Sequence, residues 1–333
     1  MTKTLTLTIP SYNVEKFLEQ TLNSFVDDSI LNDIEVIIVD DGSKDNTAKI
    51  AKAYEEKYKN TFKLISKENG GHGSTINTGI KNATGKYFKV IDGDDWVNTE
   101  QLVELIKYLK KSDVDMIFTN YIEFYEDTKT TKKIEFLGFE NDTEYTFEEI
   151  SDKEIIPMHS LAFKTEILQK NNIVIDENSF YVDVEYILFP IPFIKTVKFF
   201  DLYIYVYRLA QANQSVSING FQKHIDNHLN VIDTLLDFSE QYSKSDNYNP
   251  KYLGYINRRI ADMVCTQGAV FSSYSVEDKD IKEQFIKFDN MIKNRNVEIY
   301  NISSSLSPKL KLLRKTNFNF YKTIQRLSKI KNK

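Results

Sequence analysis

The sequence predicts an α/β fold with a mostly parallel central sheet flanked by helices, followed by a mainly helical C-terminal region. Three observations predict it. Strand-like and helix-like segments alternate along residues 4–120, whereas helical periodicity dominates residues 220–333. In addition, polar clusters follow the strand-like segments, and the most acidic of them is Asp92-Gly93-Asp94-Asp95.

The alternating elements follow from hydrophobic periodicity. Apolar residues with period two predict a strand over Leu5–Ile9, and apolar residues at helical spacing predict a helix over Val14–Phe25. We expect Asn98 to cap a later helix, with Gln101 completing a capping box. Single helices between strands indicate βαβ units. The remaining elements are expected at 34–39 (strand), 45–58 (helix), 62–66 (strand), 74–82 (helix), 86–91 (strand), 99–111 (helix) and 114–119 (strand).

The pattern also indicates the domain organisation. Residues 1–219 are expected to form one domain, with an alternating half at 1–120 and a mixed half at 121–219. Strands are expected at 132–139 and 197–209, and a short helix at 164–170. Residues 220–333 are expected to form a helical region with no internal repeat.

Composition limits the compartment. The 333 residues are 41% hydrophobic, which is ample for a buried core. Cys265 is the single cysteine, so no intrachain disulfide forms, which fits a reducing compartment. The N-terminal residues lack the apolar core of a signal peptide, and the longest apolar run, residues 186–194, contains two prolines. We therefore expect a cytoplasmic protein.

Charge is segregated along the chain. The net charge is −5, but residues 309–333 contain nine Lys/Arg and no Asp/Glu, which leaves −14 on the rest. Because nucleic-acid binding depends on positive charge that neutralises phosphates, the acidic body argues against a nucleic-acid-binding function. The apolar residues of the basic tail fit two interpretations that the sequence leaves open. The tail either packs on the body or contacts an anionic membrane surface, on the inner face of the membrane.

The acidic cluster is the most informative motif. Asp92, Asp94 and Asp95 follow a strand-like run, and ligands of parallel sheets bind beyond the carboxyl ends of strands. Such a concentration of negative charge is unfavourable unless a positive group is bound there. Oxygen ligands suit Mg²⁺ or Mn²⁺ holding a diphosphate. The alternative is a solvated acidic turn before a helix.

Together, the motifs resemble those of the family 2 glycosyltransferases. Each is weak alone, but their order and spacing are specific, and the resemblance covers roughly residues 3–220. It implies a GT-A fold and an inverting enzyme that uses a nucleotide-diphosphate sugar. The motifs are Thr8-Ile9-Pro10-Ser11-Tyr12-Asn13, Val39-Asp40-Asp41-Gly42-Ser43, Asn69-Gly70-Gly71 with Asn77-x-Gly79, Ala83-x-Gly85-Lys86-Tyr87, and Asp92-Gly93-Asp94-Asp95.

The resemblance implies where the donor binds. Asp41 matches the carboxylate that accepts a hydrogen bond from the uracil N3–H, while Asp40 or Ser43 is the better cap for the following helix. Pro10 alone is equally consistent with a plain turn. The other positions implied to contact the nucleotide sugar are Pro10, Tyr12, Asn69, Gly70, Gly71, Asp92, Gly93 and Asp95.

Within the Asp-x-Asp motif, the resemblance implies that Asp94 is the main ligand of a Mn²⁺ or Mg²⁺ cofactor. Asp92 also matches a metal position, and it would contact the ribose or reach the metal through water. Asp95 either orients the sugar or begins the next helix. A divalent ion at this place neutralises the diphosphate as it leaves.

The resemblance also implies the general base. Asp183, about ninety residues after the acidic cluster, aligns with the family's catalytic base and would take the proton of an acceptor hydroxyl. Val182 departs from the glutamate that relatives carry there. Glu185 is the competing candidate, and Asp183 is favoured.

Four further positions bear on the site, and two of them, His72 and Arg208, are open to two interpretations. Ile76 replaces an arginine of many relatives, and Lys67 or His72 is near enough in sequence to compensate. His72 either meets the donor or is an ordinary turn residue. His159 matches a segment that binds the acceptor. Arg208 either grips the diphosphate or makes a structural ion pair.

The sequence thus predicts a metal-dependent, inverting transferase. It would move a hexose or N-acetylhexosamine from a UDP-sugar to a hydroxyl of a polysaccharide, a teichoic acid or a lipid-linked oligosaccharide of bacterial surface-glycan synthesis. One alternative is a sugar nucleotidyltransferase, which needs a basic, Gly-rich N-terminal loop that Pro10-Ser11-Tyr12-Asn13 does not provide. Another is a catalytically silent carbohydrate-binding or scaffold protein on the same fold.

Overall fold

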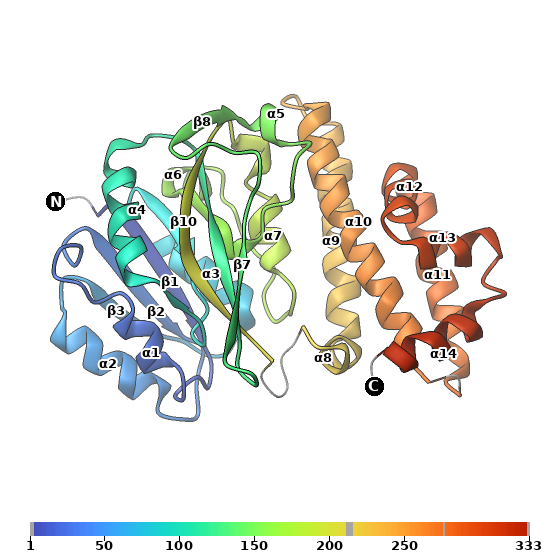
Figure 1. The fold of residues 1–333 in the computed structure, drawn as a ribbon, viewed down its shortest axis with the longest axis horizontal. Helices are drawn as coiled ribbons and strands as arrows, with labels where there is room; N and C mark the ends of the chain where they lie inside the picture. Colours follow the sequence, from blue (N-terminus) through green and yellow to red (C-terminus); the bar gives the residue numbers. More distant parts are fainter. Residues whose placement is uncertain (1–2, 211–215, 276, 332–333) are drawn as a thin grey trace. The chain divides into compact units, whose positions relative to one another are not determined.

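The structure, a computed structural model, describes residues 3–210, 216–275 and 277–331. The chain divides into two compact units, Met1–Ala212 and Asn213–Lys333. The boundary expected after residue 219 lies inside helix α8 (Ile218–Lys223) of the second unit. All predicted site residues belong to the first unit, which Figure 1 shows in blue to yellow-green.

The described part of unit 1 contains a ten-stranded sheet in the order β3-β2-β1-β4-β9-β6-β10-β5, with β7 on β6 and β8 on β10. β1, β2, β3 and β4 are parallel to one another, and β6 is parallel to β10. β9 is antiparallel to both β4 and β6. The strands are β1 (Leu5–Ser11), β2 (Ile34–Asp40), β3 (Phe62–Ser66), β4 (Tyr87–Val90), β5 (Trp96–Val97), β6 (Met116–Tyr125), β7 (Thr130–Ile134), β8 (Thr143–Thr146), β9 (Leu161–Lys164) and β10 (Thr196–Leu209).

Helices connect these strands, as the alternating pattern predicts (Figure 1). Parallel strands joined by helices place all their carboxyl ends at one edge of the sheet, hereafter the carboxyl edge. The opposite edge is the amino edge. The helices of unit 1 are α1 (Leu18–Asn23), α2 (Thr47–Lys57), α3 (Gly71–Asn82), α4 (Thr99–Lys111), α5 (Phe147–Ile150), α6 (Thr165–Lys170) and α7 (Asp183–Leu188), with short 3₁₀ turns η1 (Met158–Ser160) and η2 (Ile191–Phe193).

Several details differ from the sequence expectation, among them the strand expected at 132–139, which is β7 and ends at Ile134. Helix α1 begins at Leu18 rather than Val14, because side chains at and just before the start of α2 hold the preceding backbone. Asp45 accepts from the Glu15 N–H at 3.1 Å, and Thr47 accepts from the Val14 N–H at 2.9 Å. Helix α3 begins at Gly71 rather than Ser74. Asn98 does cap α4, since its side chain accepts from the Gln101 N–H at 3.2 Å. The reciprocal half of the capping box is absent, because the side-chain oxygen Oε1 of Gln101 accepts from the Tyr203 N–H instead.

The core of unit 1 explains why these elements hold together. The strand residues Leu5, Leu7, Ile9, Val36 and Ile38 are fully buried and pack with apolar residues of α1 and α4. Burying each such side chain contributes about 1.5–3 kcal/mol. A rigid sheet therefore presents its carboxyl-edge loops in fixed positions.

Unit 2 is helical in its described residues, as expected. Its buried His228 pairs through Nδ1 with Gln267 at 2.8 Å. No helix among the described residues is both long and apolar enough to cross a bilayer. The helices are α8, α9 (Ile225–Ser243), α10 (Pro250–Ser273), α11 (Lys279–Arg295), α12 (Val297–Leu306), α13 (Pro308–Lys315) and α14 (Tyr321–Lys331).

Candidate active site

A cavity of about 520 Å³ opens at the carboxyl edge, beyond the ends of β1, β2 and β3. Tyr12, with 51% of its surface exposed, stands at one wall, and Asn69 at another. An aromatic ring beside amide and carboxylate groups suits a nucleobase, which needs both stacking and edge hydrogen bonds. The lining residues are Tyr12, Asp40, Gly42, Lys44, Ser66, Lys67, Glu68 and Asn69.

Asp40, rather than Asp41, lines this cavity. The Asp40 carboxylate accepts a hydrogen bond from the Ser43 N–H at 3.1 Å, which fixes it at the end of β2. Asp40 was expected only to cap the following helix. Asp40 does not cap α2, whose N-cap is Asn46; it holds the turn before that helix and lines the cavity.

Asp41 instead organises the start of α3. Its carboxylate is 2% exposed and accepts from the N–H groups of Gly70 (2.9 Å) and Gly71 (2.8 Å). Lys67 Nζ donates to the same carboxylate at 2.9 Å, and Ser74 Oγ at 3.4 Å. A carboxylate at a helix N-terminus satisfies donors that the helix itself cannot, which is why α3 begins early. Gly70 and Gly71 thus bond to Asp41.

The acidic turn is built by short contacts to β1 and α1. Gly93 N–H donates to the carbonyl of Pro10 at 3.0 Å, and a Cβ at Gly93 would meet that oxygen at 2.8 Å. Thr21 Oγ1 donates to the Gly93 carbonyl at 3.0 Å. A larger residue than glycine would push the turn away from β1. Pro10 is buried, and its visible role is to hold this turn.

Asp95 faces inward. Its carboxyl group accepts from the hydroxyl of Tyr205 and, at 2.7 Å, from the N–H of Arg208. Burial, then the charges of Asp94 and Asp92, raise the pKa of Asp95 well above its ordinary value. The sequence left two roles open for Asp95, orienting the sugar or beginning the next helix. Neither describes it fully, because Asp95 joins the acidic turn to β10.

Asp92 and Asp94 are half-buried in the turn. His72 Nε2 lies 2.8 Å from Asp92 Oδ1 and forms an ion pair with it when protonated. Burial lowers the pKa of His72, but the charges of Asp92, Asp183 and Asp94 outweigh burial and raise the pKa overall. His72 therefore supplies a positive charge to this cluster, next to the position where Ile76 replaces an arginine.

Asp183 converges with the acidic turn on two side chains. Asp183, Asp92 and Asp94 all act on the pKa of His72, and the same three also raise the pKa of Tyr207, after burial and together with Asp95. Two segments about ninety residues apart in sequence thus meet in one cluster. Asp183 is half-buried at the first position of α7.

Glu185, the competing base, is fully buried. Its Oε2 accepts from the Asp176 N–H at 2.7 Å, and burial raises the pKa of Glu185 to about 8. Its carboxyl group is therefore mostly protonated at neutral pH and anchors the loop before α7. That loop packs on the start of α3, where a Cβ at Gly73 would meet the Asp176 carbonyl at 2.0 Å.

Arg208 is enclosed by protein groups. It is 5% exposed, forms an ion pair with Glu126, and donates through Nε to the Asp94 carbonyl at 2.8 Å. Its guanidinium also lies 4.5 Å from the ring centroid of Trp96. Between the two interpretations, these contacts favour the structural ion pair, which links the acidic turn to β10.

His159, the expected acceptor contact, lies beside the acidic turn. Its ring stacks on Tyr207 with centroids 4.1 Å apart and meets Tyr205 edge-on at 4.8 Å. Burial raises the pKa of Asp92, but the charge of His72 and, after it, that of His159 outweigh burial and lower the pKa overall. His159 therefore belongs to the same cluster as the carboxylates.

Sequence reasoning missed Tyr205, Tyr207 and Lys89. The tyrosines alternate along β10, a period-two signal that placed them on one face of the strand, but nothing in the pattern showed that this face meets the acidic turn. Lys89 was visible as one cation inside the apolar strand β4.

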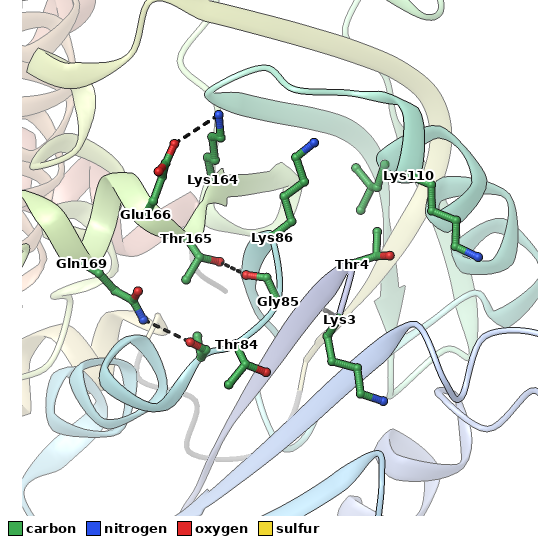
Figure 2. A pocket seen from close by; sticks show the side chains of 12 residues that line it. Lys3, Thr4, Thr84, Gly85, Lys86, Lys110, Lys164, Thr165, Glu166 and Gln169 are labelled. Carbon is green, nitrogen blue, oxygen red and sulfur yellow. Dashed lines mark hydrogen bonds and ion pairs between the residues drawn. The ribbon is translucent and has the colours of Figure 1, made fainter. Parts of the chain in front are cut away.

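A second cavity, of about 450 Å³, lies at the amino edge of the sheet (Figure 2). Four lysines line it, but their ammonium groups have protein partners. Lys86 and Lys164 share Asp113, and Lys110 pairs with Asp33 at 2.7 Å. Lys3 donates to the Leu31 carbonyl at 3.2 Å. This cavity carries none of the chemistry of the carboxyl edge.

Known proteins share both sequence and fold with this chain. The model of glycosyl transferase family 2 matches residues 6–170. The uncharacterized glycosyltransferase EpsJ of Bacillus subtilis is 28% identical over 68% of this chain and 66% of its own length. Glycosyltransferase GlyA of Streptococcus pneumoniae is 34% identical over 37% of this chain. The chain spans 66% of EpsJ but only 17% of GlyA.

Solved structures extend the likeness in fold. The structure of Staphylococcus aureus TarS 1–349 with UDP-GlcNAc covers 97% of this chain and 90% of its own, with a TM-score of 0.69 and 19% identity. The mannosyltransferase PcManGT of Pyrobaculum calidifontis, with GDP-Man and Mn²⁺, has a TM-score of 0.51 and 13% identity. At these identities the likeness concerns the fold alone, which is the expected GT-A fold. With its order of motifs, its sheet and the match over residues 6–170, the chain belongs to glycosyl transferase family 2.

Proposed function

We propose that this chain is an inverting glycosyltransferase that moves a hexose or N-acetylhexosamine from a UDP-sugar to a hydroxyl of a glycan. The observation that carries the proposal is that His72, which lies 2.8 Å from Asp92, is acted on by the charges of Asp92, Asp183 and Asp94. A transferase needs a cation to stabilise the leaving diphosphate and a base for the incoming alcohol, and carboxylates of this cluster would hold the first and act as the second.

The nucleobase would occupy the 520 Å³ cavity. We assign the reading of the uracil edge to Asp40 rather than Asp41, because Asp40 lines the cavity whereas Asp41 bonds to Gly70 and Gly71. Tyr12 would stack on the base, and Asn69 would close the opposite wall. Support for UDP as the nucleotide comes from TarS, which was solved with UDP-GlcNAc on the same fold.

Asp94 and Asp92 fit a divalent cation of the Mg²⁺ or Mn²⁺ type. The described residues contain no cluster of three or more ligating side chains, but Mg²⁺ is usually held by one or two carboxylates together with substrate phosphates. By its place in the Asp-x-Asp motif, Asp94 would be the main ligand. When bound, the ion would neutralise negative charge that builds on the departing diphosphate.

Asp183 would then act as the general base. It accepts the proton of the acceptor hydroxyl while that oxygen bonds to the anomeric carbon, and the bond from that carbon to the diphosphate oxygen breaks, releasing UDP. Attack from the face opposite the nucleotide inverts the configuration. Glu185 is unsuited because burial keeps it mostly protonated at neutral pH.

The acceptor is proposed as a bacterial surface glycan, such as a polysaccharide, a teichoic acid or a lipid-linked oligosaccharide. The support is that one relative, 33% identical over 33% of this chain, is the minor teichoic acid biosynthesis protein GgaB of Bacillus subtilis. His159 would contact this acceptor, since its ring lies in the carboxylate cluster and stacks on Tyr207.

The tail would bring the enzyme to the inner face of a membrane. Among the tail side chains that the structure describes, those of residues 309–326, most apolar ones are buried, but Leu312 and Phe320 are 45% and 50% exposed among exposed lysines. Apolar side chains within a basic surface suit anionic lipid. Replacing both with serine should reduce cosedimentation with phosphatidylglycerol vesicles, and unchanged cosedimentation would leave packing as the tail's role. Residues 332–333 lie outside the described part.

Isothermal titration of UDP with and without Mn²⁺ tests the function. We expect binding that requires the metal, followed by slow release of UDP from at least one UDP-sugar. Preferential binding of a nucleoside triphosphate would support a nucleotidyltransferase. Absence of metal-dependent nucleotide binding would support a silent carbohydrate-binding or scaffold protein.

A further inference from the structure

Lys89 is a buried ammonium group beneath the acidic cluster, and the proposed chemistry gives it no task. It lies on β4 between apolar neighbours and is 1% exposed. Among the described residues, no carboxylate is within ion-pair distance of its Nζ, and burial lowers the pKa of Lys89 to about 7. Burying a lysine without an acidic partner is costly, so compensating contacts must hold it.

Two carbonyl groups provide that compensation. Lys89 Nζ donates to the carbonyl of His159 at 2.6 Å and to that of Leu161 at 3.0 Å. β4 and β9 are paired only at Tyr87–Lys164 and Phe88–Phe163. Past these two pairs the strands are no longer joined by backbone hydrogen bonds, and the Lys89 ammonium group donates to the His159 and Leu161 carbonyls in their place.

Both ends of this contact reach the candidate active site. On one side, the ring of His159 stacks on Tyr207 and meets Tyr205. On the other side, Lys89 Nζ lies 5.6 Å from the ring centroid of Tyr205, whose hydroxyl donates to Asp95 and accepts from the Asp92 N–H at 3.2 Å. Lys89 therefore touches the supports of both the acidic turn and His159.

We propose that Lys89 is a positioning residue of the transferase, which fixes the Met158–Leu161 segment, and with it the ring of His159, against the acidic turn. This inference rests on the proposed function. Lys89 does not line the cavity formed by Tyr12 and Asp40, so its loss should impair turnover and leave nucleotide binding intact.

The variant Lys89→Met removes the ammonium group and keeps an unbranched side chain. Its matched control is Lys86→Met, which removes the lysine at the amino end of the same strand. The assay is release of UDP from the UDP-sugar that the wild-type enzyme hydrolyses fastest with Mn²⁺. We expect kcat to fall at least about tenfold in Lys89→Met, with KM for the donor within about twofold, and no change in Lys86→Met.

A double-mutant cycle separates positioning from general support. If Lys89 acts through His159, adding Lys89→Met to His159→Ala should cost no further activity. Additive losses, or an unchanged kcat in Lys89→Met, would overturn the proposal. Should Lys89→Met not fold, Lys89→Gln retains one amide donor for the two carbonyls and takes its place in the cycle.

Hydrogen exchange makes the inference testable apart from the proposed function. Amides of Met158–Leu161 should exchange faster in Lys89→Met than in the wild type or in Lys86→Met. Equal exchange in all three proteins would overturn the positioning role, even if the wild type hydrolysed no UDP-sugar. Absence of hydrolysis with faster exchange would instead reject the transferase and retain the contact.

Discussion

The two edges of one sheet carry charged groups of opposite sign, lysines at the amino edge and aspartates at the carboxyl edge, and these groups differ in how they are paired. At the amino edge, lysines end on carboxylates or carbonyls, as in the pairing of Lys86 and Lys164 with Asp113. At the carboxyl edge, His72 pairs with Asp92, and the charges of Asp92, Asp183 and Asp94 all raise its pKa. Charges that balance one another stabilise a fold locally, whereas an excess of one sign prepares a site for a charged ligand.

The comparison also separates two kinds of buried acid at the carboxyl edge. Asp41 is buried with donors on both oxygens, and it builds the start of α3. Asp95 and Glu185 are buried with raised pKa values, and they join loops to the sheet. Half-buried Asp94 and Asp183 remain as the groups suited to meet substrates.

The largest effect is expected from Asp183→Asn. The amide cannot accept the acceptor's proton as a carboxylate does, so turnover should fall by about 10³-fold while UDP binding is retained. Steady-state release of UDP and calorimetric titration measure the two quantities. Glu185→Gln is the matched control, and it should keep most activity at neutral pH. If Asp183→Asn turned over normally and Glu185→Gln did not, the base would be Glu185.

A smaller effect is expected from Asp94→Ala. Removing the main metal ligand should weaken Mn²⁺-dependent UDP binding by at least about tenfold, or about 1.4 kcal/mol. Titration of UDP at fixed Mn²⁺ measures it, and UDP binding without metal provides the reference. An identical titration curve in the variant would exclude Asp94 from the metal site.

Glu185 should make stability depend on pH. Its pKa is about 8 in the folded protein, against an ordinary value of 4.5, so the folded state binds more protons between these values. Stability therefore falls as pH rises through this window. In Glu185→Gln, the melting temperature should fall several degrees less between pH 5 and pH 8 than in the wild type. Parallel curves for the two proteins would show that Glu185 titrates normally.

The smallest effect is expected at the amino edge. Lys110→Met removes an ammonium group that pairs with Asp33 and is itself half exposed. Exposed ion pairs contribute little, so the free energy of unfolding should change by less than about 1 kcal/mol and UDP binding should be unchanged. Denaturant titration and calorimetry measure these. Loss of UDP binding would indicate that the nucleotide binds at the amino edge and would contradict the proposed site at the carboxyl edge.

Much of the fold was predictable because it depends on local patterns. β1, β2, β3 and the helix at 99–111 followed from apolar periodicity, and Asn98 was correctly identified as a cap. The antiparallel insertion of β9 between β4 and β6 was not predictable, because strand order depends on contacts distant in sequence. The start of α3 depends on Asp41, thirty residues upstream of Gly71.

The site was predictable in its motifs but not in the direction of each side chain. Adjacent residues Asp40 and Asp41 diverge at the end of β2, so a motif alone does not tell which one lines the cavity. Arg208 is similar, since its enclosure by Glu126 and Trp96 arises from tertiary packing. Assigning roles within a motif therefore required coordinates.

The central claim is that the carboxyl edge holds the donor between Asp94 and Asp183. The most direct measurement is a crystal structure of Asp183→Asn with Mn²⁺ and the UDP-sugar that the wild type hydrolyses. The account predicts the base in the cavity beside Asp40, the metal at Asp94, and the anomeric carbon facing residue 183. A nucleotide bound among the lysines of the amino edge, or residue 183 turned away from the sugar, would contradict it.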